Sequence, residues 1–133
     1  MKLTLDYEPT AKGVPRVRFV NGHALTYYHK NTTEGLEAIR AMLYNKHLKP
    51  FPEHTPVKMD VTFYRTKSKW YRPKSEKLPC RKPDTTNFLK LLEDCLSGII
   101  IPDDAAITTI IARKRWTKLN HGYIEITLEQ DSL

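Results

Sequence analysis

The alternation of apolar and polar residues from Val57 to Tyr64 constrains the fold of this chain more than any other feature. Valine, methionine, valine and phenylalanine occupy every second position, with lysine, aspartate, threonine and tyrosine between them. A period of two residues places one set of side chains on one face of a β-strand. We therefore expect a strand over residues 57–64 whose apolar face lies against a core.

A helix from about Asp84 to Ser97 is predicted to cover the sheet that contains this strand. Plotted at 100° per residue, its apolar residues fall on one arc that must face the sheet. The arc consists of Phe88, Leu91, Leu92, Cys95, Leu96 and Ile99. Asn87, Lys90 and Asp94 lie on the opposite side, and Gly98 is a favourable residue just past the helix C-terminus.

The remaining elements complete a small α+β domain. Asn31 and Glu34 form a capping-box-like helix start, and Lys49-Pro50 stops that helix. Strands are expected at 1–7, 16–20, 23–28, 106–113 and 123–128, with Asn21-Gly22 as a hairpin turn. Most connections look hairpin-like. We therefore predict a single domain over residues 1–133, with a mixed, mostly antiparallel sheet covered by two helices.

Length and composition limit the function classes. The chain has 133 residues, 40% of them hydrophobic, which suffices for one core without disulfides. Its two cysteines, Cys80 and Cys95, occur without a signal peptide, so we expect a reducing, cytoplasmic setting. No apolar window approaches a membrane span, and no glycine-rich phosphate loop is present. We expect neither a membrane partner nor a small-molecule cofactor.

The net charge of +7 is concentrated in one segment, residues 65–83, which we call the basic loop. It contains eight basic residues against one acid, Glu76, which leaves 14 basic and 14 acidic residues elsewhere. The basic residues are Arg65, Lys67, Lys69, Arg72, Lys74, Lys77, Arg81 and Lys82. With Trp70 and Tyr71 among them, they suit a polyanion with stackable bases. A solvated loop that maintains solubility is an equally good interpretation, and Trp70 is as consistent with a buried structural role as with stacking.

Acidic residues and one lysine near the second helix form a candidate metal site. Asp84 lies at its N-cap position, and Asp103-Asp104 lies in the turn that follows. Carboxylate oxygens hold Mg²⁺, which activates water, and Lys90 is placed to stabilise charge on a phosphodiester. Each residue also has an ordinary interpretation: Asp84 as a helix cap, Asp103-Asp104 as turn residues, and Lys90–Asp94 as a surface pair. The residues alone leave the choice open.

The run from Pro83 to Lys90, followed by Asp94, Leu96, Gly98 and Asp103-Asp104, resembles the signature of the RusA-like Holliday-junction resolvases. That signature is Asp, any residue, Asp, Asn, two residues, Lys, then a helical Asp, a Gly and a later Asp-Asp. Upstream, residues 13–18, 27–30 and 57–64 are similar to the early basic strand, the Tyr-x-Lys segment and the strand before the basic loop. The resemblance covers most of the chain in the expected order.

The resemblance implies a function and a site. Members of this family are small homodimeric endonucleases of bacteria and phages that cut four-way DNA junctions symmetrically using Mg²⁺. We expect Mn²⁺ to be able to replace Mg²⁺. It implies that Asp84 and Asp104 are catalytic, metal-binding acids with Asp103 beside them, and that Lys90 acts at the scissile phosphate. The expected DNA-binding residues are Lys67, Lys69, Trp70, Arg72, Lys74, Lys77, Arg81, Lys82, Arg16 and Arg18.

One position departs from the signature. Its second Asp falls on Thr86, whose neutral hydroxyl is a weaker metal ligand. Three interpretations remain open: Asp94 or Glu93 substitutes from the same helix, Mg²⁺ binds more weakly, or the protein binds junctions without cutting them well. The leading hypothesis is a Mg²⁺-dependent junction endonuclease. The alternatives are a non-catalytic junction-binding protein and a general DNA- or RNA-binding regulator.

Overall fold

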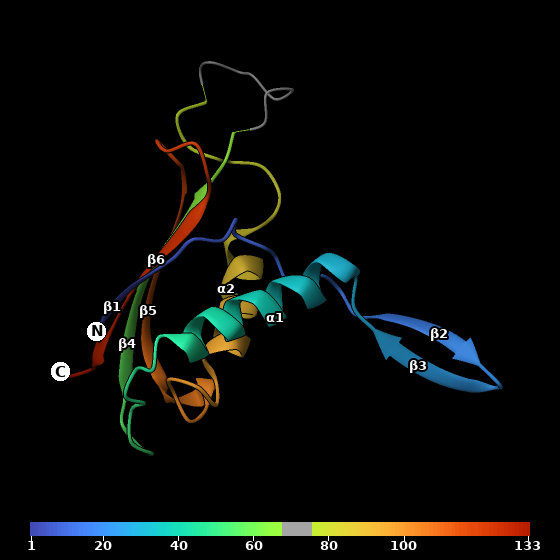
Figure 1. The fold of residues 1–133 in the computed structure, drawn as a ribbon, viewed down its shortest axis with the longest axis horizontal. Coiled ribbons are helices and arrows are strands. Elements are labelled where there is room, and N and C mark those ends of the chain that lie inside the picture. The colour runs from blue at the N-terminus through green and yellow to red at the C-terminus, as the bar shows by residue number, and fades with distance from the viewer. Residues whose placement is uncertain (68–75) are drawn as a thin grey trace.

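The strand predicted at 57–64 occupies an inner position of a four-stranded sheet (Figure 1). The computed structural model describes residues 1–67 and 76–133. In it, β4 (Val57–Arg65) pairs in parallel with β5 (Ile107–Trp116) and antiparallel with β6 (Tyr123–Gln130). On the other side of β6 lies β1 (Lys2–Leu5), also antiparallel. The order β1-β6-β4-β5 confirms a mixed, mostly antiparallel sheet.

The core forms where the apolar face of this sheet meets two helices, α1 (Lys30–Asn45) and α2 (Thr85–Leu96), which cover the same side (Figure 1). Every second residue of β4, from Val57 to Phe63, is at most 1% exposed, as the alternation predicts. The apolar arc of α2 is buried as well, and the rings of Phe63 and Phe88 lie 5.4 Å apart. These elements form one α+β domain.

The connections differ from the hairpin-like pattern that we expected. Because β4 and β5 are parallel, the chain crosses over between them through the basic loop and α2. The last two strands, β5 and β6, are not neighbours, since β4 lies between them. The prediction of mostly hairpin-like connections was wrong, because the alternation of apolar and polar residues identifies a strand but not the strand with which it pairs. Burial of the apolar face of α2 requires the crossover.

The helix ends match the sequence only in part. His29, not Asn31, is the N-cap of α1, and its Nδ1 accepts a hydrogen bond from the Asn31 backbone nitrogen at 3.2 Å. The helix ends at Asn45, before the Lys49-Pro50 stop. After α2, Gly98 adopts a φ of 81°, as its place past a helix end requires. Within the described residues, no helix is long and apolar enough to cross a membrane.

A hairpin of β2 (Arg16–Val20) and β3 (His23–Tyr27) projects beyond the end of α1, away from the main sheet (Figure 1). Asn21 and Gly22 both have positive φ, 51° and 77°, as a two-residue type I′ turn requires. Every residue of the two strands is exposed. The hairpin therefore adds little to the core, and two of the predicted DNA-binding residues, Arg16 and Arg18, lie on it.

The two cysteines differ in accessibility, which predicts their reactivity. Cys80 is exposed, whereas Cys95 is buried in α2 and its burial raises the pKa of the thiol to about 12. Because the thiolate is the nucleophile, we expect a maleimide reagent to label Cys80 in the native protein and to leave Cys95 unmodified. Peptide mass spectrometry checks this, with urea-unfolded protein, in which both thiols should react, as the control. Rapid native labelling of Cys95 would contradict the core packing.

Candidate active site and nucleic-acid interface

A cleft of about 570 Å³ lies beside the N-terminal end of α2. Three of the predicted site residues, Asp84, Lys90 and Lys82, line it together. The opposite wall comes from the segment 11–15 and from Tyr28, which the sequence did not assign to the site. The full lining is Ala11, Lys12, Gly13, Val14, Pro15, Tyr28, Lys82, Pro83, Asp84, Asn87 and Lys90.

Asp84 occupies the N-cap position of α2 as predicted, but its side chain makes no capping hydrogen bond. The residue is exposed and lines the cleft. An aspartate at this position ordinarily accepts a hydrogen bond from a backbone N–H of the first turn. Since that bond is not formed, capping does not account for the carboxylate, which faces the cleft beside the positive end of the helix dipole.

Lys114 of β5 holds the chain segment that leads into α2. Its Nζ donates hydrogen bonds to the backbone oxygens of Arg81 at 2.8 Å and Pro83 at 2.9 Å. Burial, together with the positive charge of Arg65, lowers the pKa of Lys114, and the charge of Asp84 opposes this shift. Sequence reasoning missed Lys114 because its partners lie more than thirty residues away, and no local pattern reports such a contact.

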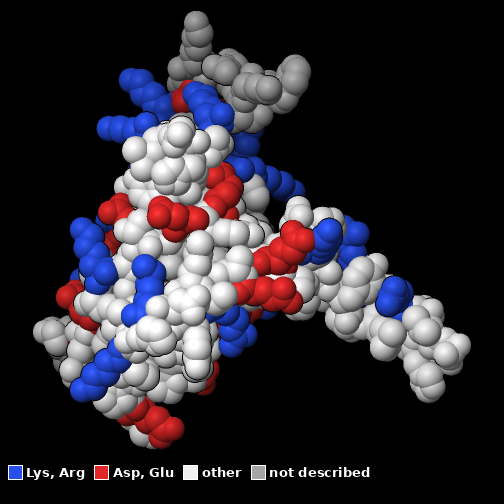
Figure 2. Space-filling view, viewed as in Figure 1, with Lys and Arg blue, Asp and Glu red and all other residues white. Residues whose placement is uncertain are grey.

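The two ends of the basic loop are tied to the domain where β4 ends. The Arg65 guanidinium lies 5.5 Å from the Phe88 ring centroid and 5.9 Å from that of Trp116. Arg65 also donates to the Lys82 backbone oxygen at 3.5 Å, and the Lys67 ammonium lies 5.5 Å from the Trp116 ring. Figure 2 shows basic side chains gathered at this end of the domain. The described ends of the loop therefore present a positive surface.

The predicted DNA-binding residues fall into three sets. Lys67, Lys77, Arg81 and Lys82 are described and lie at the ends of the basic loop. Lys69, Trp70, Arg72 and Lys74 lie outside the described residues. Arg16 and Arg18 are exposed on the projecting hairpin, where the Arg18 guanidinium lies 5.6 Å from the Tyr27 ring centroid. The structure thus places the described basic residues on separate parts of the surface.

Asp103 and Asp104 lie side by side where the short 3₁₀ helix η1 (Asp104–Ala106) begins, and both are exposed. A hydrogen bond between the two carboxyl groups raises the pKa of Asp104, with smaller contributions from burial and from the charges of Asp103 and Asp94. Burial and the charges of Asp104 and Asp94 also raise the pKa of Glu93. These carboxylates therefore repel one another, and a cation near them would be stabilised.

The acidic residues fit a metal site with few protein ligands. No three His, Cys, Asp or Glu side chains within residues 1–67 and 76–133 are close enough together to hold one ion. Asp84 and Asp94, ten residues apart, are separated by about 15 Å along the axis of α2, too far to share an ion. Magnesium, however, is commonly bound through one or two carboxylates, with water and a substrate phosphate completing its shell. Asp103 and Asp104 suit a site of that kind.

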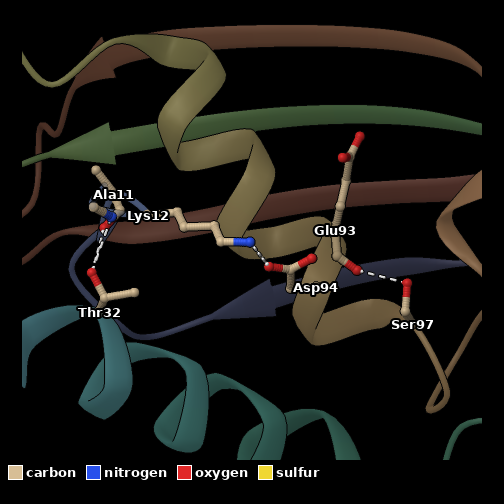
Figure 3. A network of polar contacts seen from close by, with 7 residues as sticks. Ala11, Lys12, Thr32, Glu93, Asp94 and Ser97 are labelled. Atoms are coloured by element: carbon tan, nitrogen blue, oxygen red, sulfur yellow. Dashed lines mark hydrogen bonds and ion pairs between the residues drawn. The ribbon is translucent and has the colours of Figure 1, made fainter. Parts of the chain in front are cut away.

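Asp94 makes its ion pair with a residue that the sequence did not single out. Its Oδ2 lies 2.7 Å from the Nζ of Lys12, and the same contact raises the pKa of Lys12 (Figure 3). The Lys90–Asp94 surface pair considered from the helical spacing is not the ion pair that the structure contains. The charge of Asp94 therefore raises the pKa of Asp104, while the Asp94 side chain itself is paired with Lys12 of the opposite cleft wall.

The arrangement of a carboxylate-bearing cleft beside a basic surface can be compared with known proteins. Residues 6–129 match the family model described as endodeoxyribonuclease RusA. The chain belongs to the RusA endodeoxyribonuclease family. One relative of the chain is the crossover junction endodeoxyribonuclease rusA of Lactococcus phage r1t, 28% identical over 92% of both chains. Another is the uncharacterized protein YqaN of Bacillus subtilis (strain 168), 29% identical over 89% of both chains.

Membership of the RusA family confirms the resemblance drawn from the signature residues. The matched region includes the cleft, the basic loop and the turn with Asp103 and Asp104. The family supports nuclease activity, while the individual roles of Asp84, Lys90 and Asp104 remain predictions.

We expect Lys114→Met to destabilise the domain by roughly 1–2 kcal/mol, because two backbone oxygens lose a charged donor. Urea unfolding measures the effect. Arg113→Met is the matched control: the neighbouring residue of β5 forms a half-exposed ion pair with Asp60 at 2.7 Å, whose loss should cost less than about 1 kcal/mol. Equal effects of the two substitutions would show that Lys114 does not hold the segment before α2.

Proposed function

We propose that this chain is a magnesium-dependent endonuclease that cuts four-way DNA junctions. The observation that carries the proposal is the joint placement of Asp84 and Lys90 in one cleft, next to the anchored ends of the basic loop. Membership of the RusA family and the name of the phage relative support the junction as substrate. Branched DNA is then the partner, and the DNA backbone supplies the negative charge that the basic surface attracts.

Each group of residues has a role in this proposal. The basic loop and the hairpin residues Arg16 and Arg18 bind phosphates of the junction arms. Lys90 donates to the scissile phosphate and stabilises the charge that develops there. Asp104, with Asp103 or Asp84, would hold Mg²⁺ or Mn²⁺. The bound metal supplies Lewis-acid activation of the phosphate and of the attacking water.

A homodimer follows from the proposed reaction. Symmetric cutting of a four-way junction requires two sites related by a two-fold axis. The projecting hairpin supports an additional contact, since an isolated two-stranded hairpin is only marginally stable, and Val17, Phe19 and Leu25 are exposed on it. We propose α1 and the sheet edge near it as candidates for the dimer interface.

A second candidate function is junction binding with weak cleavage or none. Thr86 favours it, because a neutral, exposed side chain occupies the second acidic position of the RusA signature. General nucleic-acid binding is the third, and preference for a junction over a duplex separates it from the first two.

Asp104→Asn tests the endonuclease proposal. We expect the variant to lose cleavage of a synthetic four-way junction in Mg²⁺, while its affinity for the junction holds or rises, because a negative charge facing phosphate is removed. Cleavage gels and mobility-shift assays measure the two effects, with and without Mg²⁺ or Mn²⁺. Asp6→Asn, an exposed aspartate outside the cleft, is the control. Loss of folding or of binding in Asp104→Asn would make Asp104 a structural turn residue.

Thr86→Asp tests the departure from the signature. We expect faster cleavage, or a lower Mg²⁺ concentration for half-maximal rate, because a carboxylate attracts the cation where a hydroxyl does not. Stability should hardly change, since Asp is favourable in the first turn of a helix. Metal titrations of the cleavage rate measure this, and Thr86→Asn controls for shape without charge. A carboxylate at position 86 that brings no gain would argue that the site is already complete.

A further inference from the structure

The segment before the β2–β3 hairpin is bound to both helices, although it forms neither a helix nor a strand itself. The Lys12 backbone nitrogen donates to the Asn87 oxygen on α2 at 2.9 Å. On the other side, the Gly13 nitrogen donates to Thr32 Oγ1 on α1 at 3.1 Å. Thr32 in turn donates to the Ala11 oxygen at 3.4 Å (Figure 3). Residues 11–13 therefore bridge the two helices at the wall of the cleft.

Close packing reinforces this bridge. A Cβ at Gly35 of α1 would lie 3.0 Å from the Thr10 side chain, so the helix surface leaves no room there for a larger residue. The Lys12 side chain extends from the bridge across to α2, where its ammonium meets Asp94 at 2.7 Å, and it lies 5.5 Å from the Tyr28 ring centroid. The two side chains are only 28% and 38% exposed, so water screens the pair less than it would at an open surface.

From this geometry we infer that Lys12 is a positioning residue of the site, which holds the cleft wall on α2 and commits Asp94 to an ion pair instead of to a metal ion. The inference rests on the proposed function. Asp94 and Glu93 are the two residues that could replace the carboxylate missing at position 86, and the ion pair argues against Asp94. The contact occupies Oδ2 of Asp94, and the adjacent ammonium repels a cation that approaches the other oxygen, so the pair weakens Asp94 as a ligand for Mg²⁺. Figure 3 also shows that the Glu93 side chain points away from Lys12 and Asp94.

The inference assigns a consequence to the pair. The cleft wall formed by residues 11–15 stands opposite Asp84 and Lys90, so its distance from α2 sets the width available to a DNA strand. Loss of either partner would let this wall move and misplace the scissile phosphate relative to Lys90. A displacement of about 1 Å at a reacting group is enough to slow a reaction substantially.

Four proteins test the inference: the wild type, Lys12→Met, Asp94→Asn, and the double variant. On a synthetic four-way junction, each single substitution should lower kcat on the order of tenfold, with a smaller change in KM, because the scissile phosphate is misplaced rather than unbound. The double variant should be no slower than the slower single variant, since the same pair is broken once. Lys12→Arg should retain most of the rate, because the guanidinium also reaches a carboxylate.

Calorimetric titration with Mn²⁺, without DNA, separates a partner of Lys12 from a metal ligand. Lys12→Met frees a negative charge and should bind Mn²⁺ as tightly as the wild type or more tightly. The double variant restores the charge balance and should match the wild type. A loss of roughly tenfold or more in both variants that lack Asp94 would make Asp94 a ligand and overturn the inference. Multiplying losses of kcat in the double variant would overturn it too.

A control and a separate readout keep the inference distinct from the proposed function. Lys49→Met removes an exposed lysine that does not line the cleft and should leave kcat and Mn²⁺ affinity unchanged. A wild-type chain that cuts no junction and binds no Mn²⁺ would contradict the proposed function. Thermal unfolding then decides on Lys12: shifts in Tm that are less than additive in the double variant support the pair, and additive shifts overturn it.

Discussion

Burial of one face of α2 against the sheet is the constraint on which the rest of the structure depends. Phe88 packs on Phe63 of β4, and the neighbouring apolar residues of the helix are buried with it. A helix held by one face has no freedom to rotate, so Lys90 and Asp94 must point away from the core. The hydrophobic core thereby sets the directions of the polar groups in the candidate site, although none of those groups contributes to it.

The parallel pairing of β4 with β5 brings the cationic groups together. The carboxyl ends of two parallel strands lie at the same end of the sheet. Here Arg65 is paired with Trp116, and Phe63 is paired with Lys114. The basic loop begins at that end of the sheet, and its last residues return there before α2 begins. Lys114 can therefore bind the returning segment, and Arg65 can contact both Phe88 and Lys82. If a hairpin had joined the two strands, they would be antiparallel, and their carboxyl ends would lie at opposite ends of the sheet.

Charge is divided along α2. The positive end of the helix dipole, Lys82 and Lys90 lie near the cleft, whereas the charges of Glu93 and Asp94 lie close enough to Asp104 in the acidic turn to affect its surroundings electrostatically. Lys12 spans this division, because its backbone is bonded near the first turn of the helix and its ammonium reaches the last. A surface that attracts phosphate next to one that attracts a cation is an arrangement that suits metal-assisted cleavage of a phosphodiester.

The sequence by itself determined the element types, the buried faces and the family, because periodicity and a signature confined to residues 83–104 are local properties. The order of residues along α2 also sufficed to place Asp84 at its N-cap and Lys90 on the side opposite the core, whereas the cleft that they line was not predicted. Strand order, the crossover and the partners of Lys12 and Lys114 were decided only by the tertiary structure. Lys12 and Asp94 are 82 positions apart, and their contact exists because both walls of the cleft pack on the same core. No pattern within one segment encodes an interaction that depends on where another segment is placed.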